Sequence, residues 1–269
     1  MAIRMIVTDM DGTLLDAKNR ISEANRAAIK EAAEKGISLA IATGRMHRSA
    51  LPYMETLGVA APIISCNGAL VKTAAGEEIF SSCIAPAAVR EVLDCMRERG
   101  WYVQLYRLDG LFFAAETAEA RFYRTASGVA GRAVGEEGLL ARTEGVPKLL
   151  VVADTSAHTA AVIAEIAAAF PGEIDVMQST ATYIEIVPAG VSKASAMLKV
   201  AADYGISAAE IMALGDSGND VAMLRAAGLG VAMGNAAPEV QQAADAVTDS
   251  VAEDGAALAV RRYVLEAGR

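Results

Sequence analysis

Cysteine, histidine and tryptophan are scarce in this sequence. Its 269 residues include three cysteines, two histidines and one tryptophan. The cysteines, Cys66, Cys83 and Cys95, are odd in number and lack metal-site spacing, so we expect buried thiols in a reducing compartment. Neither His47 nor His158 falls at the end of an expected strand, and we expect neither to be a metal ligand.

Long hydrophobic runs and an excess of positive charge are also missing. No stretch of about 18 residues is free of charged side chains, and the N-terminus, MAIRMIVTDMDG, lacks the apolar region of a signal peptide. Acidic residues outnumber basic ones by 33 to 24, which gives a net charge of −9 and argues against nucleic acid as a partner. We therefore expect a cytoplasmic protein that binds neither membranes nor nucleic acids.

Both ends of the chain contain a regular alternation of short apolar runs and helical segments. The runs IRMIVTD, ISLAIAT, PIISCNG, IMALGD and LGVAMG have the length and composition of buried strands. SEANRAAIKEAAEKG, with Ser22 as its N-cap and Gly36 just past its end, and SKASAMLKVAADYG are typical of helices. The alternation predicts an α/β fold, with a Rossmann-like, doubly wound parallel sheet covered by helices on both faces.

A different pattern occupies the middle of the chain. After the helical segment PAAVREVLDCMRERG come the strands WYVQLYR and LFFAAE, which Asp109-Gly110 joins as a hairpin, and then KLLVVAD, TAAVIAEIAAAF, EIDVMQS and TYIEIVP. We predict an α+β domain, residues 86–187, inserted into a core formed by residues 1–85 and 188–269. Residues 128–147 are rich in glycine and yield no assignment.

Polar residues follow several of the expected strands. Asp9 and Asp11 end the first, Thr43 ends the second, and Asp216 and Asp220 follow IMALG. In an open parallel sheet, binding sites form beyond the carboxyl ends of the strands. Crowded carboxylates favour a nearby cation, and carboxylate oxygens are the ligands that Mg²⁺ prefers. Thr43 and Lys193 would add a hydroxyl and a positive charge that suit a phosphoryl group.

Four motifs together resemble those of a known family. They are DMDGTLL at 9–15, ATGR at 42–45, GVSKASAM at 190–197 and GDSGNDVAML at 215–224, and SCNGAL at 65–70 fits the same pattern. On these motifs the chain resembles, over its whole length, the haloacid dehalogenase (HAD) superfamily and its Cof-type subgroup of phosphatases. The inserted domain then corresponds to a C2-type cap. Gly218 stands where many relatives have a larger or acidic residue, a departure that leaves the expected metal binding intact.

The resemblance implies a Mg²⁺-dependent phosphatase that forms an aspartyl-phosphate. Asp9 would be the nucleophile and Asp11 the general acid and base. The metal ligands would be Asp9, Asp11 (through its backbone carbonyl) and Asp216, with Asp220 orienting neighbouring groups from behind them. The phosphoryl oxygens would be bound by Thr43, the amide of Gly44, Lys193 and Asn219.

Further expectations concern the surroundings of this loop. Residues 14–21, LLDAKNRI, would form either a short hairpin that shields the intermediate from water or an ordinary surface turn. Alternation along TYIEIVP places Tyr183 and Glu185 on one strand face, which we expect to be polar and open. Alternation along WYVQLYR likewise places Tyr102, Gln104 and Tyr106 on one face of that strand. Glu185, with Arg45 and Asn67, is therefore a candidate contact to the leaving group; a solvated strand face is the alternative.

The expected substrate is a small phosphorylated metabolite, such as a sugar phosphate, because a polymer would not fit easily beneath a cap. Two other functions stay open. A phosphomutase would pass the phosphoryl group to a second hydroxyl instead of water, and a phosphosugar sensor would not catalyse at all. A sensor would usually lack Asp9 or Asp11, and both are present here. The oligomeric state is not predicted.

Overall fold

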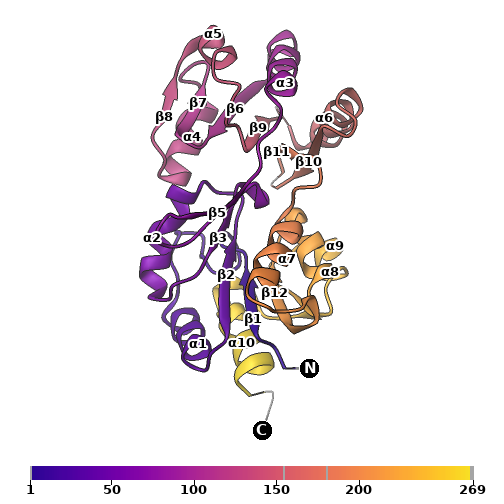
Figure 1. Cartoon of the computed structure of the whole chain (residues 1–269). Helices are drawn as coiled ribbons and strands as arrows, with labels where there is room; N and C mark the ends of the chain where they lie inside the picture. The colour runs from indigo at the N-terminus through magenta and orange to yellow at the C-terminus, as the bar shows by residue number, and fades with distance from the viewer. Residues whose placement is uncertain (1, 154, 180, 267–269) are drawn as a thin grey trace. The chain divides into compact units, whose positions relative to one another are not determined.

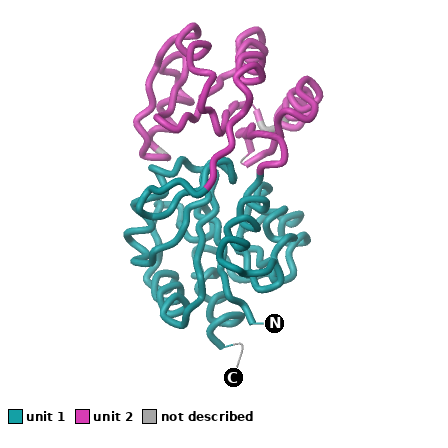
Figure 2. The backbone as a smooth tube through the Cα atoms, viewed as in Figure 1, with its two compact units in different colours: residues 1–79, 192–269 teal, residues 80–191 magenta. Residues whose placement is uncertain are grey.

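The structure, a computed structural model, describes residues 2–153, 155–179 and 181–266. The chain divides into two compact units, one drawn from residues 1–79 and 192–269 and the other from residues 80–191 (Figure 2). The second unit is thus an insertion in the first. The limits predicted from the sequence, residues 86 and 187, lie a few residues inside this second unit.

The first unit is built on a sheet of eight strands, counted over the described residues, in the order β14-β13-β12-β1-β2-β3-β4-β5 (Figure 1). Neighbours from β14 to β3 are parallel, whereas β3 and β4 form an antiparallel pair. The strands are β1 (Met5–Thr8), β2 (Ser38–Ala42), β3 (Ile63–Ser65), β4 (Leu70–Lys72), β5 (Glu78–Ser81), β12 (Ile211–Gly215), β13 (Leu229–Ala232) and β14 (Ala246–Val247). The predicted parallel sheet therefore carries an additional antiparallel edge.

Helices cover both faces of this sheet, which confirms the doubly wound arrangement. They are α1 (Glu23–Glu34), α2 (His47–Leu57), α7 (Lys193–Asp203), α8 (Val221–Ala226), α9 (Pro238–Gln241) and α10 (Gly255–Val260). α1, α2 and α10 share a hydrophobic core with β1, β2 and β12, and α7 and α8 pack on the opposite face. Because both faces are covered, β1 and β12 are buried along their whole length and read as continuous apolar runs.

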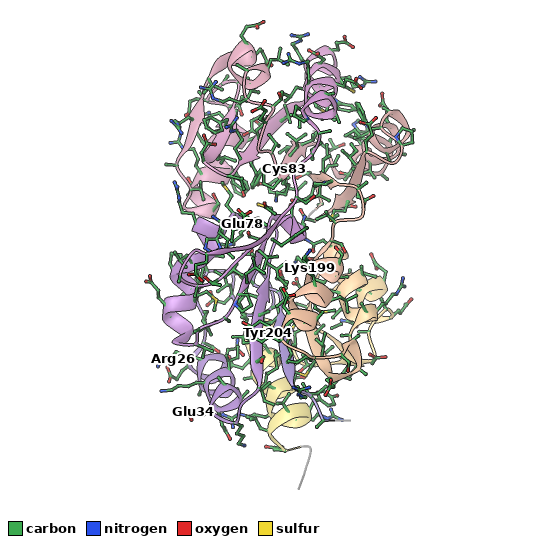
Figure 3. The ribbon with its side chains drawn as sticks, viewed as in Figure 1. Arg26, Glu34, Glu78, Cys83, Lys199 and Tyr204 are labelled. Atoms are coloured by element: carbon green, nitrogen blue, oxygen red, sulfur yellow. The ribbon has the colours of Figure 1, made fainter. Side chains whose placement is uncertain are left out.

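α1 illustrates how the sequence specifies these helices. The Ser22 side chain accepts a hydrogen bond from the Asn25 amide and so caps the helix, as predicted. Ala28 and Ile29 are buried in the core, whereas Arg26 and Glu34 lie on the exposed side (Figure 3). This amphipathic pattern fixes which side of α1 faces the sheet.

The second unit contains a six-stranded sheet, as far as its residues are described, in the order β10-β11-β9-β6-β7-β8. All neighbours are antiparallel except β7 and β8, which are parallel. The strands are β6 (Tyr102–Arg107), β7 (Gly110–Phe113), β8 (Gly131–Ala133), β9 (Lys148–Val152), β10 (Ile174–Gln178) and β11 (Tyr183–Pro188); the helices are α3 (Pro86–Arg99), α4 (Ala118–Ser127), α5 (Gly135–Leu140) and α6 (Ser156–Ala169). α3 and α6 pack on the sheet face that carries Val103, Leu149 and Ile184.

Short helical turns complete the chain. Among the described residues, four are 3₁₀ helices, and one is a π-helical turn that follows α10. They are η1 (Cys66–Gly68), η2 (Ala208–Glu210), η3 (Gly218–Asp220), η4 (Val251–Glu253) and the π-helical η5 (Arg261–Leu265). Two of them, η1 and η3, follow β3 and β12 at the ends of sheet strands.

The structure of residues 128–147 and the exposure of the cysteines both differ from what the sequence predicted or left unassigned. Residues 128–147, which had no assignment, contain β8 and α5. Cys66 is buried, but Cys83 is exposed and Cys95 is partly exposed, so the expectation that all the thiols are buried is wrong for these two. Cys83 lies in the connection between β5 and α3, and connections run over the surface. Within the described ranges, every helix is too short or too polar to cross a membrane.

Candidate active site

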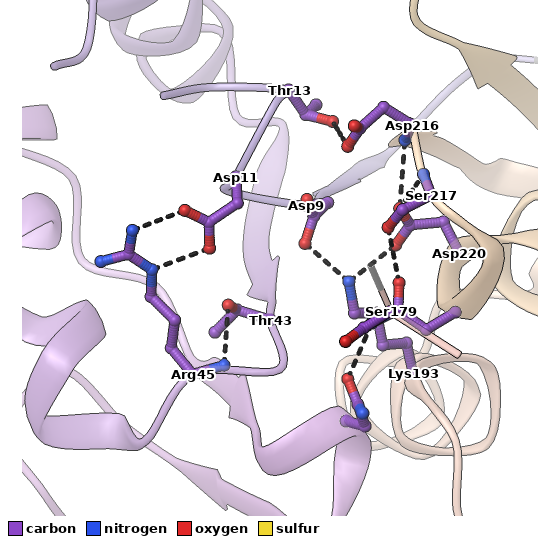
Figure 4. A network of polar contacts seen from close by, with 12 residues as sticks. Asp9, Asp11, Thr13, Thr43, Arg45, Ser179, Lys193, Asp216, Ser217 and Asp220 are labelled. Carbon is purple, nitrogen blue, oxygen red and sulfur yellow. Dashed lines mark hydrogen bonds and ion pairs between the residues drawn. The ribbon is translucent and has the colours of Figure 1, made fainter. Parts of the chain in front are cut away.

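The carboxyl ends of four neighbouring strands bring the sequence motifs together in the first unit. β12, β1, β2 and β3 are adjacent and parallel. Asp9 follows β1, Thr43 follows β2, η1 follows β3, and Asp216 follows β12. Segments that are far apart in sequence therefore converge at one edge of the sheet (Figure 4).

Lys193, the first residue of α7, lies between two carboxylates. Its Nζ donates hydrogen bonds to Oδ1 of Asp9 over 2.6 Å and to Oδ1 of Asp220 over 2.7 Å (Figure 4). All three side chains are buried, with exposed fractions of 1%, 5% and 0% for Lys193, Asp9 and Asp220. Burial alone would lower the pKa of Lys193, but Asp220 and Asp9 raise it above its ordinary value, so the ammonium group stays charged.

The ionised form of Asp9 is disfavoured by its surroundings. Burial, together with the charges of Asp220, Asp216 and Asp11, raises the pKa of Asp9 well above its usual range, although Lys193 opposes the shift. A carboxylate in these surroundings is destabilised unless further positive charge is near. The arrangement therefore favours binding of a cation.

Asp216 completes an acidic group beside Asp9. One carboxylate oxygen from each of Asp9, Asp216 and Asp220 can be chosen so that the three lie within 4.8 Å of one another. Burial and the charge of Asp220 raise the pKa of Asp216 to about 6, against a hydrogen bond that Thr13 Oγ1 donates over 3.1 Å. Oxygen donors of this kind suit a hard divalent cation.

Gly12 approaches Asp216 so closely that no side chain would fit. It has a φ of +78°, and a Cβ placed there would lie 2.4 Å from Oδ2 of Asp216. Both the backbone conformation and the close approach require glycine in the DxDGT segment. The loop after β1 and the loop after β12 are thus packed directly against each other.

Asp220 organises the loop that carries Asp216. Its Oδ2 accepts hydrogen bonds from the backbone amides of Asp216 and Ser217, each at 3.0 Å, while Oδ1 accepts from Lys193. Both oxygens are therefore engaged by the protein. Asp220 thereby holds the backbone of the loop that carries Asp216.

Thr43 and its neighbours form the turn after β2. Thr43 is fully buried, and its Oγ1 accepts a hydrogen bond from the Arg45 amide over 3.1 Å. Gly44 lies between them and is half-buried. The turn sits beside the loop after β1 because β1 and β2 are neighbours in the sheet.

Asp11 is held apart from the acidic group by Arg45. Arg45 Nε donates to Oδ2 of Asp11 over 2.7 Å and Nη2 donates to Oδ1 over 2.5 Å (Figure 4). This two-pronged pairing directs the Asp11 side chain away from Asp216 and Asp220, and the carboxylate is not part of the group that could hold a metal. The pairing with Arg45 was not predicted from the sequence.

Asn67 is buried next to Asn219, one of the candidate phosphate-binding residues, and is not exposed to solvent. It is fully buried, and its Oδ1 accepts a hydrogen bond from Nδ2 of Asn219 over 3.0 Å. Cys66, Asn67 and Gly68 all have positive φ values, and the amides of Cys66 and Asn67 donate to the carbonyls of Arg45 and Thr43. This unusual backbone run fixes the Asn67 side chain toward Asn219.

In the second unit, Glu185 does not stand on an open polar face, so that expectation is wrong. Its side chain is 7% exposed and forms an ion pair with Lys148, which is 1% exposed. Ser179 donates a hydrogen bond to Glu185 over 2.7 Å, and the Lys148 ammonium lies 4.1 Å from the centre of the Tyr106 ring. Strand alternation predicts which residues share a face, but it does not say what covers them.

The same face carries a continuous chain of polar contacts. Tyr102 donates to Gln104 over 2.8 Å, and Gln104 donates to Tyr106 over 3.0 Å. Tyr106 also meets the Tyr123 ring edge-on, at 5.8 Å between centroids. The predicted grouping of Tyr102, Gln104 and Tyr106 is confirmed, and Gln104 and Tyr106 are buried.

Several residues of the site were missed by sequence reasoning. Thr13 contacts Asp216, and Asn235 donates to the Gly12 carbonyl over 2.9 Å. Asn19 and Tyr53 both contact Arg45. Asn235 follows β13 at the same edge of the sheet, so its position after LGVAMG was a usable signal. No local pattern marks Asn19 or Tyr53.

Residues 14–21, named the flap from here on, do form a hairpin-like loop. Leu15 pairs antiparallel with Ile21, and the Asp16 amide donates to the Arg20 carbonyl. The Asp16 side chain closes the turn by accepting from the amides of Lys18 and Arg20. Of the two alternatives, the short hairpin describes the backbone.

Comparison with known proteins agrees with this fold. The sequence model of the haloacid dehalogenase-like hydrolase family matches residues 6–260. The chain is 30% identical over 266 residues to the 5-amino-6-(5-phospho-D-ribitylamino)uracil phosphatase YcsE of Bacillus subtilis, covering 98% of this chain and 96% of that protein. It is 27% identical over 278 residues to the phosphatase YwpJ of the same organism, covering 95% and 98%.

Solved structures show the same relationship. A haloacid dehalogenase-like hydrolase from Bacteroides thetaiotaomicron is similar with a TM-score of 0.85 at 30% identity, over 97% of this chain and 99% of that one. The phosphatase BT1666 of the same organism gives a TM-score of 0.83 at 29% identity, over 97% and 95%. The chain belongs to the haloacid dehalogenase-like hydrolase family and is a phosphoric monoester hydrolase.

Proposed function

We propose that the protein is a Mg²⁺-dependent phosphatase that hydrolyses a small phosphorylated metabolite through an aspartyl-phosphate on Asp9. The observation that carries the proposal is the buried pairing of Asp9 with Lys193 beside Asp216, at the edge of the sheet where strand ends converge. A nucleophile, a fixed positive charge and oxygen ligands for a cation are then available in one place.

In the first step, a carboxylate oxygen of Asp9 attacks phosphorus, and the bond from phosphorus to the leaving oxygen breaks. Asp11 gives that leaving oxygen a proton. In the second step, water attacks the phosphorus, Asp11 accepts a proton from it, and the bond to Asp9 breaks to release inorganic phosphate. The half-exposed Asp11 side chain is accessible to both reactants.

The phosphoryl oxygens are bound by Thr43, the Gly44 amide, Lys193 and Asn219. Lys193 supplies a full positive charge that Asp9 and Asp220 keep in place. Asn219 is oriented by Asn67 below it and by Ser217, whose Oγ donates to Asn219 Oδ1 over 2.8 Å. Preorganised donors of this kind stabilise the charge that spreads over the oxygens in the transition state.

The residues present fit a hard divalent cation. Asp9 and Asp216 would hold it, with the backbone carbonyl of Asp11, while Asp220 keeps the Asp216 loop in place. When bound, Mg²⁺ would neutralise the carboxylates and polarise the phosphoryl group. The raised pKa values of Asp9 and Asp216 are the expected property of a site in which a cation balances the charge.

The substrate is a small metabolite with hydroxyl groups near its phosphate. Support comes from the relative YcsE, whose name describes hydrolysis of a phosphorylated ribityl compound, and that compound is the first to test. Glu185, with Lys148 beside it, is our candidate for binding hydroxyls of the leaving group. The candidate rests on chemistry: a carboxylate accepts hydrogen bonds from hydroxyls, and Lys148 and Ser179 hold this carboxylate in place.

The test uses Asp9→Asn and Asp11→Asn, with exposed Asp203→Asn as the matched control. Asp9→Asn removes the nucleophile and should lower kcat by about 10³-fold or more. Rapid-quench measurements on Asp11→Asn should show slower formation and slower hydrolysis of the aspartyl-phosphate. If Asp9→Asn keeps activity within about tenfold of the parent, the proposed nucleophile is wrong. Release of free phosphate without a bisphosphate activator separates a phosphatase from a phosphomutase.

A further inference from the structure

Arg45 and Asp11 form a pair joined by two hydrogen bonds at the edge of the site. Nε and Nη2 of the guanidinium bind one carboxylate oxygen each, at 2.7 and 2.5 Å. The two residues are 34 positions apart in sequence and come from the turns after β2 and β1. A fork of this geometry fixes both the position and the orientation of a carboxylate plane.

Arg45 is itself held firmly. Its side chain is only 11% exposed, its guanidinium lies 5.3 Å from the centre of the Tyr53 ring, and Nη1 lies 3.4 Å from the Tyr53 hydroxyl. Nη2 also donates to Oδ1 of Asn19 over 2.7 Å. The Asp11 side chain, in contrast, is 51% exposed. Arg45, the more buried of the two, therefore determines where the Asp11 carboxylate lies.

This pairing with Arg45 affects how the Asp11 carboxylate interacts with the expected cation site. Asp11 is two residues from Asp9, and a free carboxylate there would compete for the cation that Asp9 and Asp216 are arranged to bind. The fork draws the Asp11 carboxylate away from that group. Each of its oxygens still has a second lone pair on which a proton can be carried.

We propose that Arg45 is a positioning residue for proton transfer by Asp11, which it keeps away from the cation site and directed toward the leaving oxygen. The inference rests on the proposed function. It gives Arg45 a role different from the direct contact to the leaving group that the sequence suggested. The same guanidinium donates a hydrogen bond to Asn19, so Arg45 also contacts the turn of the flap.

The test is a double-mutant cycle with Asp11→Asn, Arg45→Gln and the double variant, each assayed on phenyl phosphate and on 4-nitrophenyl phosphate. Phenolate is a basic leaving group that needs a proton, whereas 4-nitrophenolate needs little help. We expect Arg45→Gln to lower kcat/KM on phenyl phosphate by about 10²-fold, the usual range for general acid catalysis, and to lower kcat/KM on 4-nitrophenyl phosphate far less. The comparison uses kcat/KM because it covers only the steps up to release of the leaving group, whereas hydrolysis of the aspartyl-phosphate is common to both esters. The double variant should be no slower than Asp11→Asn alone.

Arg45→Lys keeps a positive charge but not the fork, so it should recover little of the phenyl phosphate activity. Exposed Arg48→Gln on α2 is the matched control and should match the parent on both esters. Circular dichroism on each variant confirms folding. Equal losses on the two esters, or losses that multiply in the double variant, would show that Arg45 acts on the substrate directly and would overturn the inference. A parent that needs no metal, or an active Asp9→Asn, would instead overturn the proposed function.

Discussion

Lys193 Nζ lies 2.6 Å from Oδ1 of Asp9, and both side chains are buried. The ammonium group balances carboxylates that would otherwise repel one another in a poorly solvated site. Replacing it by methionine keeps the volume and removes the charge, so Asp9 and Asp220 lose their partner. Removing one member of a buried pair destabilises a protein by about 3–5 kcal/mol.

The first prediction is therefore that Lys193→Met lowers the free energy of unfolding in chelator by an amount of that order and abolishes turnover. Mg²⁺ should recover part of the stability, because it supplies positive charge to the same carboxylates, but none of the activity. Urea unfolding with and without Mg²⁺ measures both. Lys199→Met, an exposed position on the same helix, is the control; equal effects at the two positions would contradict the prediction.

The second prediction uses a pair of glycines with similar backbone angles. Gly12 and Gly36 have φ values of +78° and +82°, but a Cβ would meet Asp216 at Gly12 and nothing within 4 Å at Gly36. Both alanine variants should lose about 1 kcal/mol of stability or somewhat more from backbone strain. Only Gly12→Ala should also displace Asp216 and lose metal-dependent activity, measured as kcat against Mg²⁺ concentration. Similar kinetics for the two variants would refute the proposed packing effect.

The third prediction concerns the cation directly. Asp216→Asn removes one ligand charge while keeping the shape and the capacity to accept from Thr13. We expect weaker Mg²⁺ binding by isothermal titration calorimetry, and loss of the Mg²⁺-induced rise in Tm that the parent should show. Asp203→Asn serves as the comparison because it changes the same net charge at an exposed position. Unchanged Mg²⁺ affinity in Asp216→Asn would remove this residue from the metal site.

The fourth prediction concerns the second unit. Glu185→Ala removes the carboxylate that pairs with the buried Lys148 ammonium, and should destabilise the protein by about 3–5 kcal/mol. A Lys148→Met, Glu185→Leu double variant should recover much of that loss, since it removes both charges. With the double variant folded, turnover of the ribityl phosphate should fall while turnover of 4-nitrophenyl phosphate is preserved. If the double variant turns over each substrate as fast as the parent does, Lys148 and Glu185 have no role in substrate recognition.

Much of the fold could be predicted because local and global signals agree. Strands β1, β2 and β12 are buried on both faces and therefore read as unbroken apolar runs, and chemically distinctive residues follow each of them. Asp9, Thr43 and Asp216 could be placed together because the ends of parallel neighbours share one edge. This reasoning needs only parallel strands in one sheet, which the alternation with helices predicts.

The rest depends on what packs against a residue, and alternation carries no such information. Glu185 was assigned to the correct face but not to its buried partner Lys148, which comes from another strand. The pairing of Arg45 with Asp11 requires the directions of two turns, and these follow from tertiary packing around Tyr53. In residues 128–147, many glycines obscure the period of the short β8 and α5.

The central place of β1 in its sheet has a consequence for biosynthesis. Met5 pairs with Ile211 on one side and Ser38 on the other, so the first unit cannot close until the ribosome has passed residue 211. At about 5–20 residues per second, β1 waits tens of seconds with an unpaired apolar edge. The inserted unit, which is continuous from residue 80 to 191, is complete before then. We therefore expect it to fold first on the nascent chain, while the N-terminal strands depend on chaperones until their last partner emerges.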